Sequence, residues 1–405
     1  MSLAAIPKVF SLRLPWPRQQ PDPHWIKVFR DLRTSKSRTL LVALSIMVGV
    51  SAIGTIGGAR VLLLDSMAQN VARLNPPAAV LQTDAMPEGM LAALRGLPGV
   101  ATVSGRMLLP VRIKLPEAPW RDVNLFAISS YASDPLNHVF PQTGAWPPQR
   151  GQMLFERASY AFMGAHTGDT AVVELAGGRQ QRLTVAGTAL DTSLTTPDTF
   201  YGQVNAFASM DTLDWLGVPR SINQVYVQTS DPSDRAASRA IEARVRGQLE
   251  ASGVVVNSVV VPKPQQLWSA GAVDSLLFLL GLLGTVLVFM SIFLVINMAS
   301  ALLTQQIRHI GIMKSIGAGT SQMMAMYLTM VFIFGVLAVL IGVPLGALGA
   351  KSLLDTGAKT LNFDESAFTI DPWVLALQLF AGLVLPALAA PARQTAARPA
   401  PRDRW

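Results

Sequence analysis

The sequence predicts an all-α membrane protein of four transmembrane helices that carries one large extracytoplasmic α+β domain. Half of the 405 residues are hydrophobic and only 14% are charged, whereas a typical soluble protein has about 25% charged residues. The uncharged residues gather in four apolar runs, each close to the length needed to cross a hydrocarbon core. A stretch of roughly 200 residues with mixed patterning separates the first run from the other three.

The four apolar runs are residues 39–59, 275–304, 324–350 and 373–390. A membrane helix needs about 20 apolar residues, and the last run is the shortest of the four. We therefore assign 39–66 to the first transmembrane helix and 273–390 to a membrane domain of three further helices. The first run is too long for a signal peptide and 38 residues precede it, which favours an uncleaved anchor.

The charge distribution predicts the orientation. Residues 1–38 hold eight Lys or Arg against two acids, and residues 391–405 hold four Arg against one acid. Residues 67–272 are balanced, with 16 basic and 16 acidic side chains. The net charge of +8 thus belongs to the short segments, which the positive-inside rule places in the cytoplasm. We expect a multi-pass protein of the cytoplasmic (inner) membrane with both termini inside, and no nucleic-acid partner.

Several classes of site are excluded by composition. The chain has no cysteine, so disulfides, Cys-bound zinc, iron–sulfur clusters and thiol nucleophiles are absent. Its four histidines are far apart in sequence, and no H-E-x-x-H, G-x-S-x-G or G-x-x-x-x-G-K-[ST] motif occurs. We expect no catalytic site, no metal site and no nucleotide site in this chain.

Residues 67–272 show the regular patterning of a folded domain. Strands and helices alternate near both ends, and a section at about 132–220, richer in Gly, Pro and short β runs, lies between them. The expected strands near the ends are 79–83, 100–115, 123–130, 224–228 and 254–261, and the expected helices are 88–97 and 233–251. The pattern predicts an α+β platform with a β-rich insertion, whose clearest strands are 170–175 and 181–189.

The N-terminal tail, residues 1–38, contains one amphipathic pattern. Apolar residues recur at i, i+3, i+4 and i+7 from Trp25 to Leu32, with basic residues on the other face. This pattern fits a helix lying on the inner membrane surface and equally a helix packed on a partner subunit.

Two small-residue spacings predict close helix packing in the membrane. Gly54 and Gly58 lie in the first span, and Gly342 and Gly346 lie in the third. A G-x-x-x-G spacing lets two helices approach closely in lipid. Because glycine is common in membrane helices, contacts within the chain are favoured over a dimer interface.

The stretch after the second apolar run, residues 304–320, combines basic, isoleucine and glycine residues. A helix from 275 to 309 would be roughly 50 Å long, whereas the hydrocarbon core is about 30 Å thick. We therefore expect this helix to project into the cytoplasm, with Arg308 and Lys314 beside an apolar ridge. The glycines that follow are expected to end it.

This stretch resembles the cytoplasmic coupling segment of FtsX-like permeases, the MacB and LolC/LolE class of ABC transporters, whose pattern is roughly Q-x-x-R-E-I-G-I-x-K-A-I-G-A. The residues in register are Gln305, Arg308, Ile310, Gly311, Ile312, Lys314, Ile316, Gly317 and Ala318. The order of segments is also similar, with one span, a large external domain and then three spans.

The resemblance implies a permease subunit that is not itself an enzyme. It implies a second permease copy, in a homo- or heterodimer, and a separate ABC ATP-binding subunit on which ATP and Mg are expected. It also allows a periplasmic or extracellular adaptor as a partner. Family members transmit ATP-driven closure to the external domain as a lever motion. They move or extract lipoproteins, peptides or drugs, or activate a cell-wall hydrolase.

Three positions depart from the family pattern. His309 stands where an acidic residue is usual, so one charge contact to the ATPase is missing or replaced. Residues 327–330 lack the usual Glu near the start of the third span, and the chain from 391 lacks the usual closing segment. These differences leave open a diverged subunit or half of a longer relative.

Two other functions compete with the permease hypothesis. One is a membrane-anchored sensor or regulatory scaffold, such as an activator of cell-wall hydrolases that performs no transport. The other is an autonomous small-molecule transporter. No span has an ionisable residue at its centre, which argues against ion-coupled transport by this chain.

Overall fold

The computed structural model describes residues 36–197, 203–263, 266, 270–315 and 320–389. The side chains of 36–39, 295–296, 298–315, 320–324, 326–327 and 388–389 lie outside this description, as does the amphipathic helix expected at 25–32. The chain divides into two compact units, and each is described by itself. They are Ala52–Val286 with Pro344–Leu375, and Met1–Ser51 with Leu287–Val343 and Ala376–Trp405.

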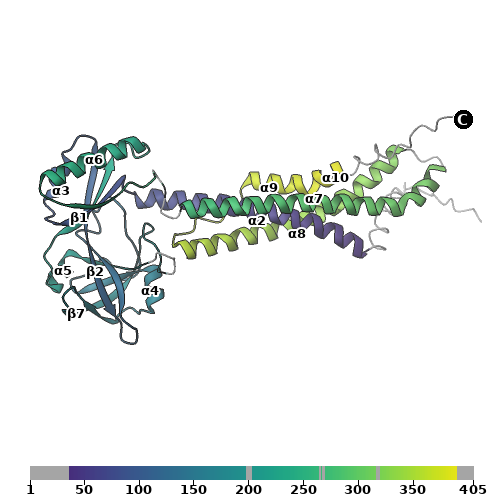
Figure 1. Ribbon diagram of the computed structural model, residues 1–405. Coiled ribbons are helices and arrows are strands. Elements are labelled where there is room, and N and C mark those ends of the chain that lie inside the picture. The colour runs from purple at the N-terminus through teal and green to yellow at the C-terminus, as the bar shows by residue number, and fades with distance from the viewer. Residues whose placement is uncertain (1–35, 198–202, 264–265, 267–269, 316–319, 390–405) are drawn as a thin grey trace, which may run out of the picture. The chain divides into compact units, whose positions relative to one another are not determined.

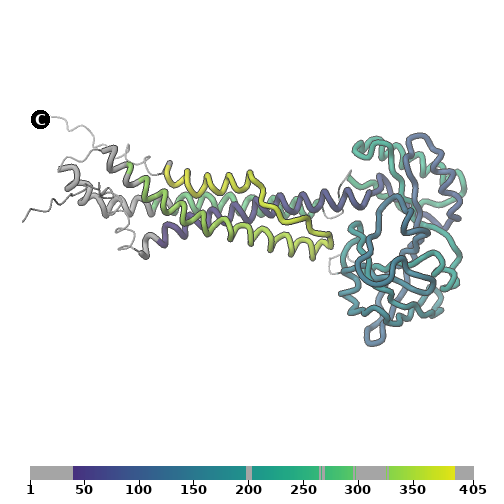
Figure 2. Tube along the Cα trace, turned by 180° about the vertical axis from the view of Figure 1, so that it is seen from behind, coloured from purple at the N-terminus to yellow at the C-terminus, as the bar shows by residue number. Residues whose placement is uncertain are grey.

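Three long helices contain the first three apolar runs: α2 (Lys36–Leu74), α7 (Ala270–Ser315) and α8 (Thr320–Leu361). All three are labelled in Figure 1, and Figure 2 traces the chain from behind. Among the described residues, the segments Leu40–Leu74, Ala270–Leu294 and Leu328–Leu361 are long and apolar enough to cross a membrane. All three helices continue beyond the expected runs.

The fourth apolar run forms a shorter helix. It comprises α9 (Pro372–Leu379), a π-turn η1 (Phe380–Val384) and α10 (Leu385–Ala389). At about 1.5 Å per residue, its apolar part Pro372–Ala387 is roughly 24 Å long, short of a hydrocarbon core of about 30 Å. Three helices, rather than the four expected, therefore meet the length criterion within the described residues.

The π-turn follows from Pro386. Proline has no backbone N–H, so the carbonyl of Gly382, four residues earlier, cannot accept the usual α-helical hydrogen bond. The N–H of Leu385 donates to the carbonyl of Phe380, five residues back. The Gly382 carbonyl lies so close to Gly335 of α8 that a Cβ atom at Gly335 would clash with it. The irregular turn thus sets where the fourth helix packs on α8.

The α+β domain contains one continuous ten-stranded sheet, in the order β10-β1-β9-β2-β3-β8-β5-β7-β4, with β6 beside β2 and β7. Its strands are β1 (Ala79–Met86), β2 (Val100–Lys114), β3 (Arg121–Ile128), β4 (Phe140–Gly144), β5 (Gln152–Glu156), β6 (Thr170–Glu174), β7 (Gln180–Leu190), β8 (Val204–Ser209), β9 (Ile222–Thr229) and β10 (Val256–Val260). Its helices are α3 (Met90–Arg95), α4 (Arg157–Met163), α5 (Met210–Leu216) and α6 (Arg235–Ala251).

Strand β6 closes part of the sheet into a ring. The pairings run β2-β3-β8-β5-β7-β6 and return to β2, because β6 pairs with both β7 and β2. We call this ring, with α4 and α5, the barrel. We call β10, β1 and β9, with α3 and α6, the sheet lobe. Strand β2 serves both: Val100–Arg106 pairs with β9, and Arg106–Lys114 pairs with β3 and β6.

Each lobe has its own apolar core. In the sheet lobe, Ile241, Val245 and Leu249 recur every four residues along α6 and form one buried face against the strands. In the barrel, alternating residues of the strands, such as Val111 and Ile113 of β2, point inward. Two cores fit the α+β class that the sequence predicts.

The residues expected to form an insertion, 132–220, contribute β4 to β8 with α4 and α5. They share a sheet with β2 and β3 instead of standing beside the platform as a separate layer. The parallel pairing of β3 with β8 joins them, over Val123–Ile128 and Val204–Ser209. Pairing between strands about 80 residues apart has no local sequence signal.

Candidate coupling and transmission sites

The predicted coupling segment lies at the C-terminal end of α7. The helix remains continuous to Ser315, so Gln305, Arg308, Ile310, Gly311, Ile312 and Lys314 all lie within it. The spacing of three and four residues places Gln305, Arg308 and Ile312 on one helix face. The other three predicted residues, Ile316, Gly317 and Ala318, lie outside the described residues, and so does the expected helix end.

The predicted packing glycines lie where α2 meets α8. A Cβ atom at Gly342 would stand 2.9 Å from Cγ1 of Val50, and one at Gly58 would stand 2.9 Å from Cβ of Ala350. The carbonyl of Gly346 accepts a hydrogen bond from the Thr55 hydroxyl at 3.4 Å. Gly54 is buried. All four glycines thus lie along α2 or α8 within the chain.

Polar contacts that the sequence did not point to also connect the helices. The Ser291 hydroxyl of α7 donates to the Ser45 carbonyl of α2 at 2.9 Å, and a Cβ atom at Gly49 would clash with Ser291. Gln378 of α9, 2% exposed, donates to the Val50 carbonyl at 3.1 Å. Such bonds contribute about 0.6 kcal/mol on average between membrane helices.

The outer end of α8 lies against the N-terminus of α4 in the barrel. Asn362 follows α8 with φ = 54°, a left-handed conformation that asparagine tolerates. Its amide nitrogen donates to the buried carboxylate of Glu156, and its amide oxygen accepts from Nε of Arg157 at 3.0 Å. Glu156 also caps α4 by accepting the N–H groups of Ala158 and Ser159.

Asp364 joins α4 to α2. Its Oδ1 accepts from Nη1 of Arg157 at 2.9 Å, and its Oδ2 accepts from Nη1 of Arg73 at 3.3 Å. Asn70 of α2 donates to the Asp364 carbonyl at 2.7 Å and accepts the Asp364 N–H at 3.2 Å. We call Arg73, Arg157, Asn362 and Asp364 the outer junction. It connects three elements distant in sequence.

A buried charged cluster lies where the two lobes meet, around Arg106 of β2. Arg106 is 1% exposed, and its Nη2 donates to Asp134 at 3.0 Å while its Nη1 lies 3.5 Å from Asp191. Its guanidinium stands 5.0 Å from the ring centre of Tyr226. The sequence does not signal this cluster, because a single Arg in a strand ordinarily faces solvent.

The Arg106 cluster holds the loop that meets the end of α2. Arg106 donates to the carbonyls of Leu136 and Asn137 in this loop. The N–H of Asn137 donates to the Asn75 carbonyl at 3.0 Å, and the N–H of His138 donates to the Leu74 carbonyl at 2.9 Å. The last turn of α2 is therefore attached to a buried part of the α+β domain.

Burial shifts the pKa values of several groups at these sites. It raises the pKa of Glu156, although the hydrogen bond from Asn362 acts in the opposite direction. It likewise raises the pKa of Asp191, against the charge of Arg106. Burial raises the pKa of Tyr226 to about 12, so its hydroxyl is neutral at pH 7. These groups are buried and hydrogen-bonded, as structural residues are.

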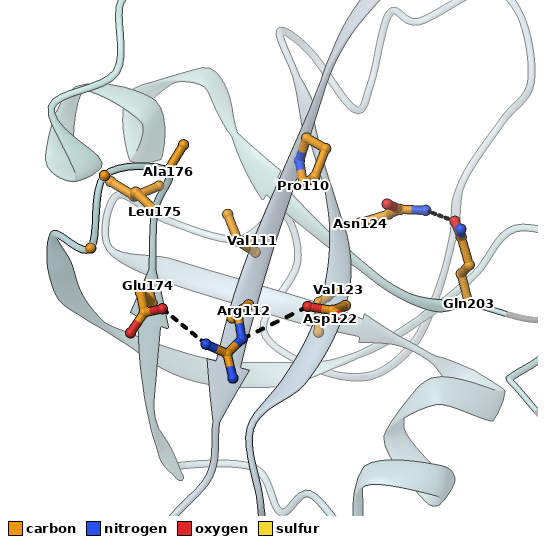
Figure 3. A pocket seen from close by; sticks show the side chains of 12 residues that line it. Pro110, Val111, Arg112, Asp122, Val123, Asn124, Glu174, Leu175, Ala176 and Gln203 are labelled. Atoms are coloured by element: carbon orange, nitrogen blue, oxygen red, sulfur yellow. Dashed lines mark hydrogen bonds and ion pairs between the residues drawn. The ribbon is translucent and has the colours of Figure 1, made fainter.

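A cleft of about 420 Å³ lies beside β2, β3 and the turn between β6 and β7 (Figure 3). Arg112 donates to Glu174 at 3.2 Å and approaches Asp122 at 3.9 Å. Asn124 donates to Gln203. The charged groups of this cleft pair with one another and are largely exposed, so the cleft has the character of an ordinary polar surface.

The comparisons identify the membrane part of the chain. Residues 281–393 match the family model described as FtsX-like permease C-terminal. This segment is similar to the C-terminal domain of FtsX-like permeases. The resemblance predicted from the coupling segment is confirmed, and the matched range includes that segment, α8 and the fourth helix. The family consists of ABC transporter permeases, which are generally non-catalytic, and it implies an ATP-binding partner.

The α+β domain is similar to domains of known structure. One is the extracellular domain of the noncanonic ABC-type transporter YknZ from Gram-positive bacteria, with 14% identity over 45% of this chain and 100% of that one, at a TM-score of 0.30. Another is the periplasmic region of MacB from Actinobacillus actinomycetemcomitans, with 9% identity over 48% and 93%, at 0.32. Comparison with curated proteins finds no match.

Proposed function

We propose that this chain is the permease subunit of an ABC transporter whose separate ATPase subunit, loaded with ATP and Mg, docks on residues 304–318. ATP hydrolysis is converted into a conformational change of the α+β domain outside the membrane. That motion exports or extracts a lipoprotein, peptide or drug-like substrate, which is handled outside or laterally from the bilayer.

One observation carries the proposal: α7 is a single helix of 46 residues that bears the family's coupling residues at its inner end. At about 1.5 Å per residue it is roughly 69 Å long, more than twice a hydrocarbon core of about 30 Å. Its outer end leads to β10 of the α+β domain through residues 261–269. A continuous helix is a suitable element for carrying a displacement from a cytoplasmic ATPase to an external domain.

The proposal includes four spans with both termini in the cytoplasm. The basic short segments support this orientation. The packing of the fourth helix supports its place in the membrane, because the buried Gln378 and the Gly382–Gly335 approach hold it on α2 and α8. A short span can be accommodated by local thinning of the bilayer.

The proposal also includes a second permease copy. Of the three long helices, α7 has the smallest buried share, 11% against 28% for α2 and 33% for α8. Its large exposed side chains include Phe278, Phe289 and Phe293. This face is available to lipid or to a second chain.

Co-purification with the ATPase tests the proposal. We expect the tagged chain, extracted from its native membrane, to bring down an ABC ATPase, and Gly311→Leu or Lys314→Glu to release it. The matched control is Lys359→Glu, which changes an exposed lysine at the other end of α8. Recovery of the full-length chain without any ATPase would support the scaffold function instead. Solute transport by the chain alone in liposomes would support an autonomous transporter.

A further inference from the structure

The two helices on either side of the coupling segment lead to different lobes of the α+β domain. The described part of α7 reaches Ser315 and that of α8 starts at Thr320, so only the four residues 316–319 separate them. At its outer end α7 is joined along the chain to β10, in the sheet lobe. Helix α8 ends instead on the barrel, where Asn362 contacts Glu156 and Arg157.

We propose that α8 transmits movement of the coupling segment to the barrel through the outer junction, while α7 transmits it to the sheet lobe. The inference rests on the proposed permease function. It makes Arg157, Asn362 and Asp364 positioning residues for the ATP-driven motion. Nothing in the chain connectivity indicates this route, because α4 precedes α8 by more than 150 residues.

The contacts at the outer junction are of a kind that can transmit a displacement from α8 to the barrel. Arg157 donates to three acceptors on the segment that follows α8: the Asn362 side chain at 3.0 Å, the Asp364 carboxylate at 2.9 Å and the Phe363 carbonyl at 3.3 Å. A planar guanidinium that bridges several acceptors fixes geometry better than a single ion pair does. Phe363 is 2% exposed and packs in the core formed by α2, α8 and the start of α7.

Further contacts join the same two parts. The buried Glu156, 0% exposed, ties Asn362 to the N-terminus of α4. The Thr196 hydroxyl lies 3.5 Å from the Thr360 carbonyl near the end of α8. The end of α8 is therefore held at side chains on both sides of β6 and β7 in sequence.

Helix α2 is linked to both lobes, to the barrel through Asp364, and so has the position of a pivot. It leads directly into β1 of the sheet lobe, and Arg73 and Asn70 hold Asp364 at the outer junction. If α7 and α8 are displaced by different amounts, the sheet lobe moves relative to the barrel. Strand β2 belongs to both lobes, so it must bend to allow this relative movement.

Spin-label distances in the full-length chain, in nanodiscs with its co-purified ATPase, test this route. The chain has no cysteine, so Ala243→Cys on α6 and Thr170→Cys on β6 place one label on each lobe. Distances are measured without nucleotide and after trapping with ADP and vanadate. The variants are Arg157→Ala and the conservative Arg157→Lys, and the matched control is Arg220→Ala, which removes surface ion pairs of α5. Hydrogen exchange at residues 363–366 is measured in parallel.

We expect trapping to shift the label-to-label distance equally in the parent and in Arg220→Ala. In Arg157→Ala this shift should be smaller by at least half, and in Arg157→Lys it should be intermediate. We expect Arg157→Ala to speed exchange at 363–366 about tenfold. An unchanged shift in Arg157→Ala, or unchanged exchange there, would overturn this route and leave the permease function standing. Absence of any shift in the parent would overturn the permease function itself.

Discussion

Nη1 of Arg157 lies 2.9 Å from Oδ1 of Asp364, although 207 positions separate the two residues in the chain. The pair brings the N-terminus of a barrel helix to the segment between α8 and α9. Asp364 also pairs with Arg73, so one carboxylate contacts two arginines from different elements.

Removing this carboxylate should weaken the α+β domain modestly. Asp364→Ala is expected to lower the free energy of unfolding by about 1–2 kcal/mol, because both ion pairs are partly exposed and therefore partly screened. Denaturant unfolding in nanodiscs measures the loss. Asp122→Ala is the control, since its carboxylate is 95% exposed and lies 3.9 Å from Arg112. Equal losses in the two variants would contradict a structural role for the outer junction.

Replacing Arg106 should have a much larger effect. Arg106→Leu would leave Asp134 and Asp191 buried without their counter-charge, a loss of about 3–5 kcal/mol. Denaturant unfolding followed by far-UV circular dichroism measures this loss of unfolding free energy. Arg112→Leu, which removes a half-exposed arginine of the same strand, should cost less than about 1 kcal/mol. A mild effect of Arg106→Leu would show that the cluster is hydrated or can rearrange.

The stability of the α+β domain should depend on pH through Glu156. Its folded-state pKa is raised above its ordinary value of 4.5, chiefly by burial, so protonation favours the folded state. The contribution is fully present below about pH 4.5 and is lost as pH rises through the folded-state pKa. Relative to Glu156→Gln, the parent should therefore lose stability as pH rises above 4.5 and then level off.

The measurement is the difference in unfolding free energy between parent and Glu156→Gln from pH 4 to pH 8. Other groups that titrate, Asp191 included, are present in both proteins and cancel in the difference. A difference that does not vary with pH would show that Glu156 has an ordinary pKa in the folded protein.

Close approach of α2 and α8 should make Gly342 intolerant of larger side chains. Gly342→Leu is expected to destabilise the helix packing by about 1–3 kcal/mol, since even a Cβ atom would stand 2.9 Å from Val50. Gly281→Leu on α7 is the matched control, because nothing lies within 4 Å of a Cβ atom there. Thermal stability in detergent distinguishes the two. Comparable melting temperatures would mean that α2 and α8 do not meet at Gly342.

Orientation can be tested by cysteine labelling, since the chain has no cysteine of its own. Ser252→Cys, on the exposed end of α6, should react with a membrane-impermeant maleimide in intact cells. His309→Cys in the coupling segment should react only after permeabilisation. The reverse pattern would invert the proposed topology.

The membrane helices and the local elements of the α+β domain could be predicted because their signals are local. Apolar runs define the three long helices, and alternation together with the spacing of Ile241, Val245 and Leu249 marks β2, β7 and α6. The length of α7 followed from an apolar run that continues into a basic, glycine-containing segment.

The tertiary connections could not be predicted in this way. Closure of the barrel depends on β6 meeting β2, and the outer junction depends on Asn362 meeting Glu156; both are non-local pairings without a motif. Arg106 resembles any strand arginine until its two carboxylate partners, 28 and 85 residues away, are known. The π-turn was also missed, although Pro386 inside an apolar helix is a recognisable signal for one.

Because β2 runs through both lobes, the barrel cannot be exchanged as a module. A chimaera that takes its barrel from a homologue must inherit Val100–Lys114 as one piece, and the donor strand must then match β9 of the recipient over its first seven residues. A shift of a single residue in β2 would misalign the neighbouring lobe, whereas a change of length in the turns between the barrel strands would not.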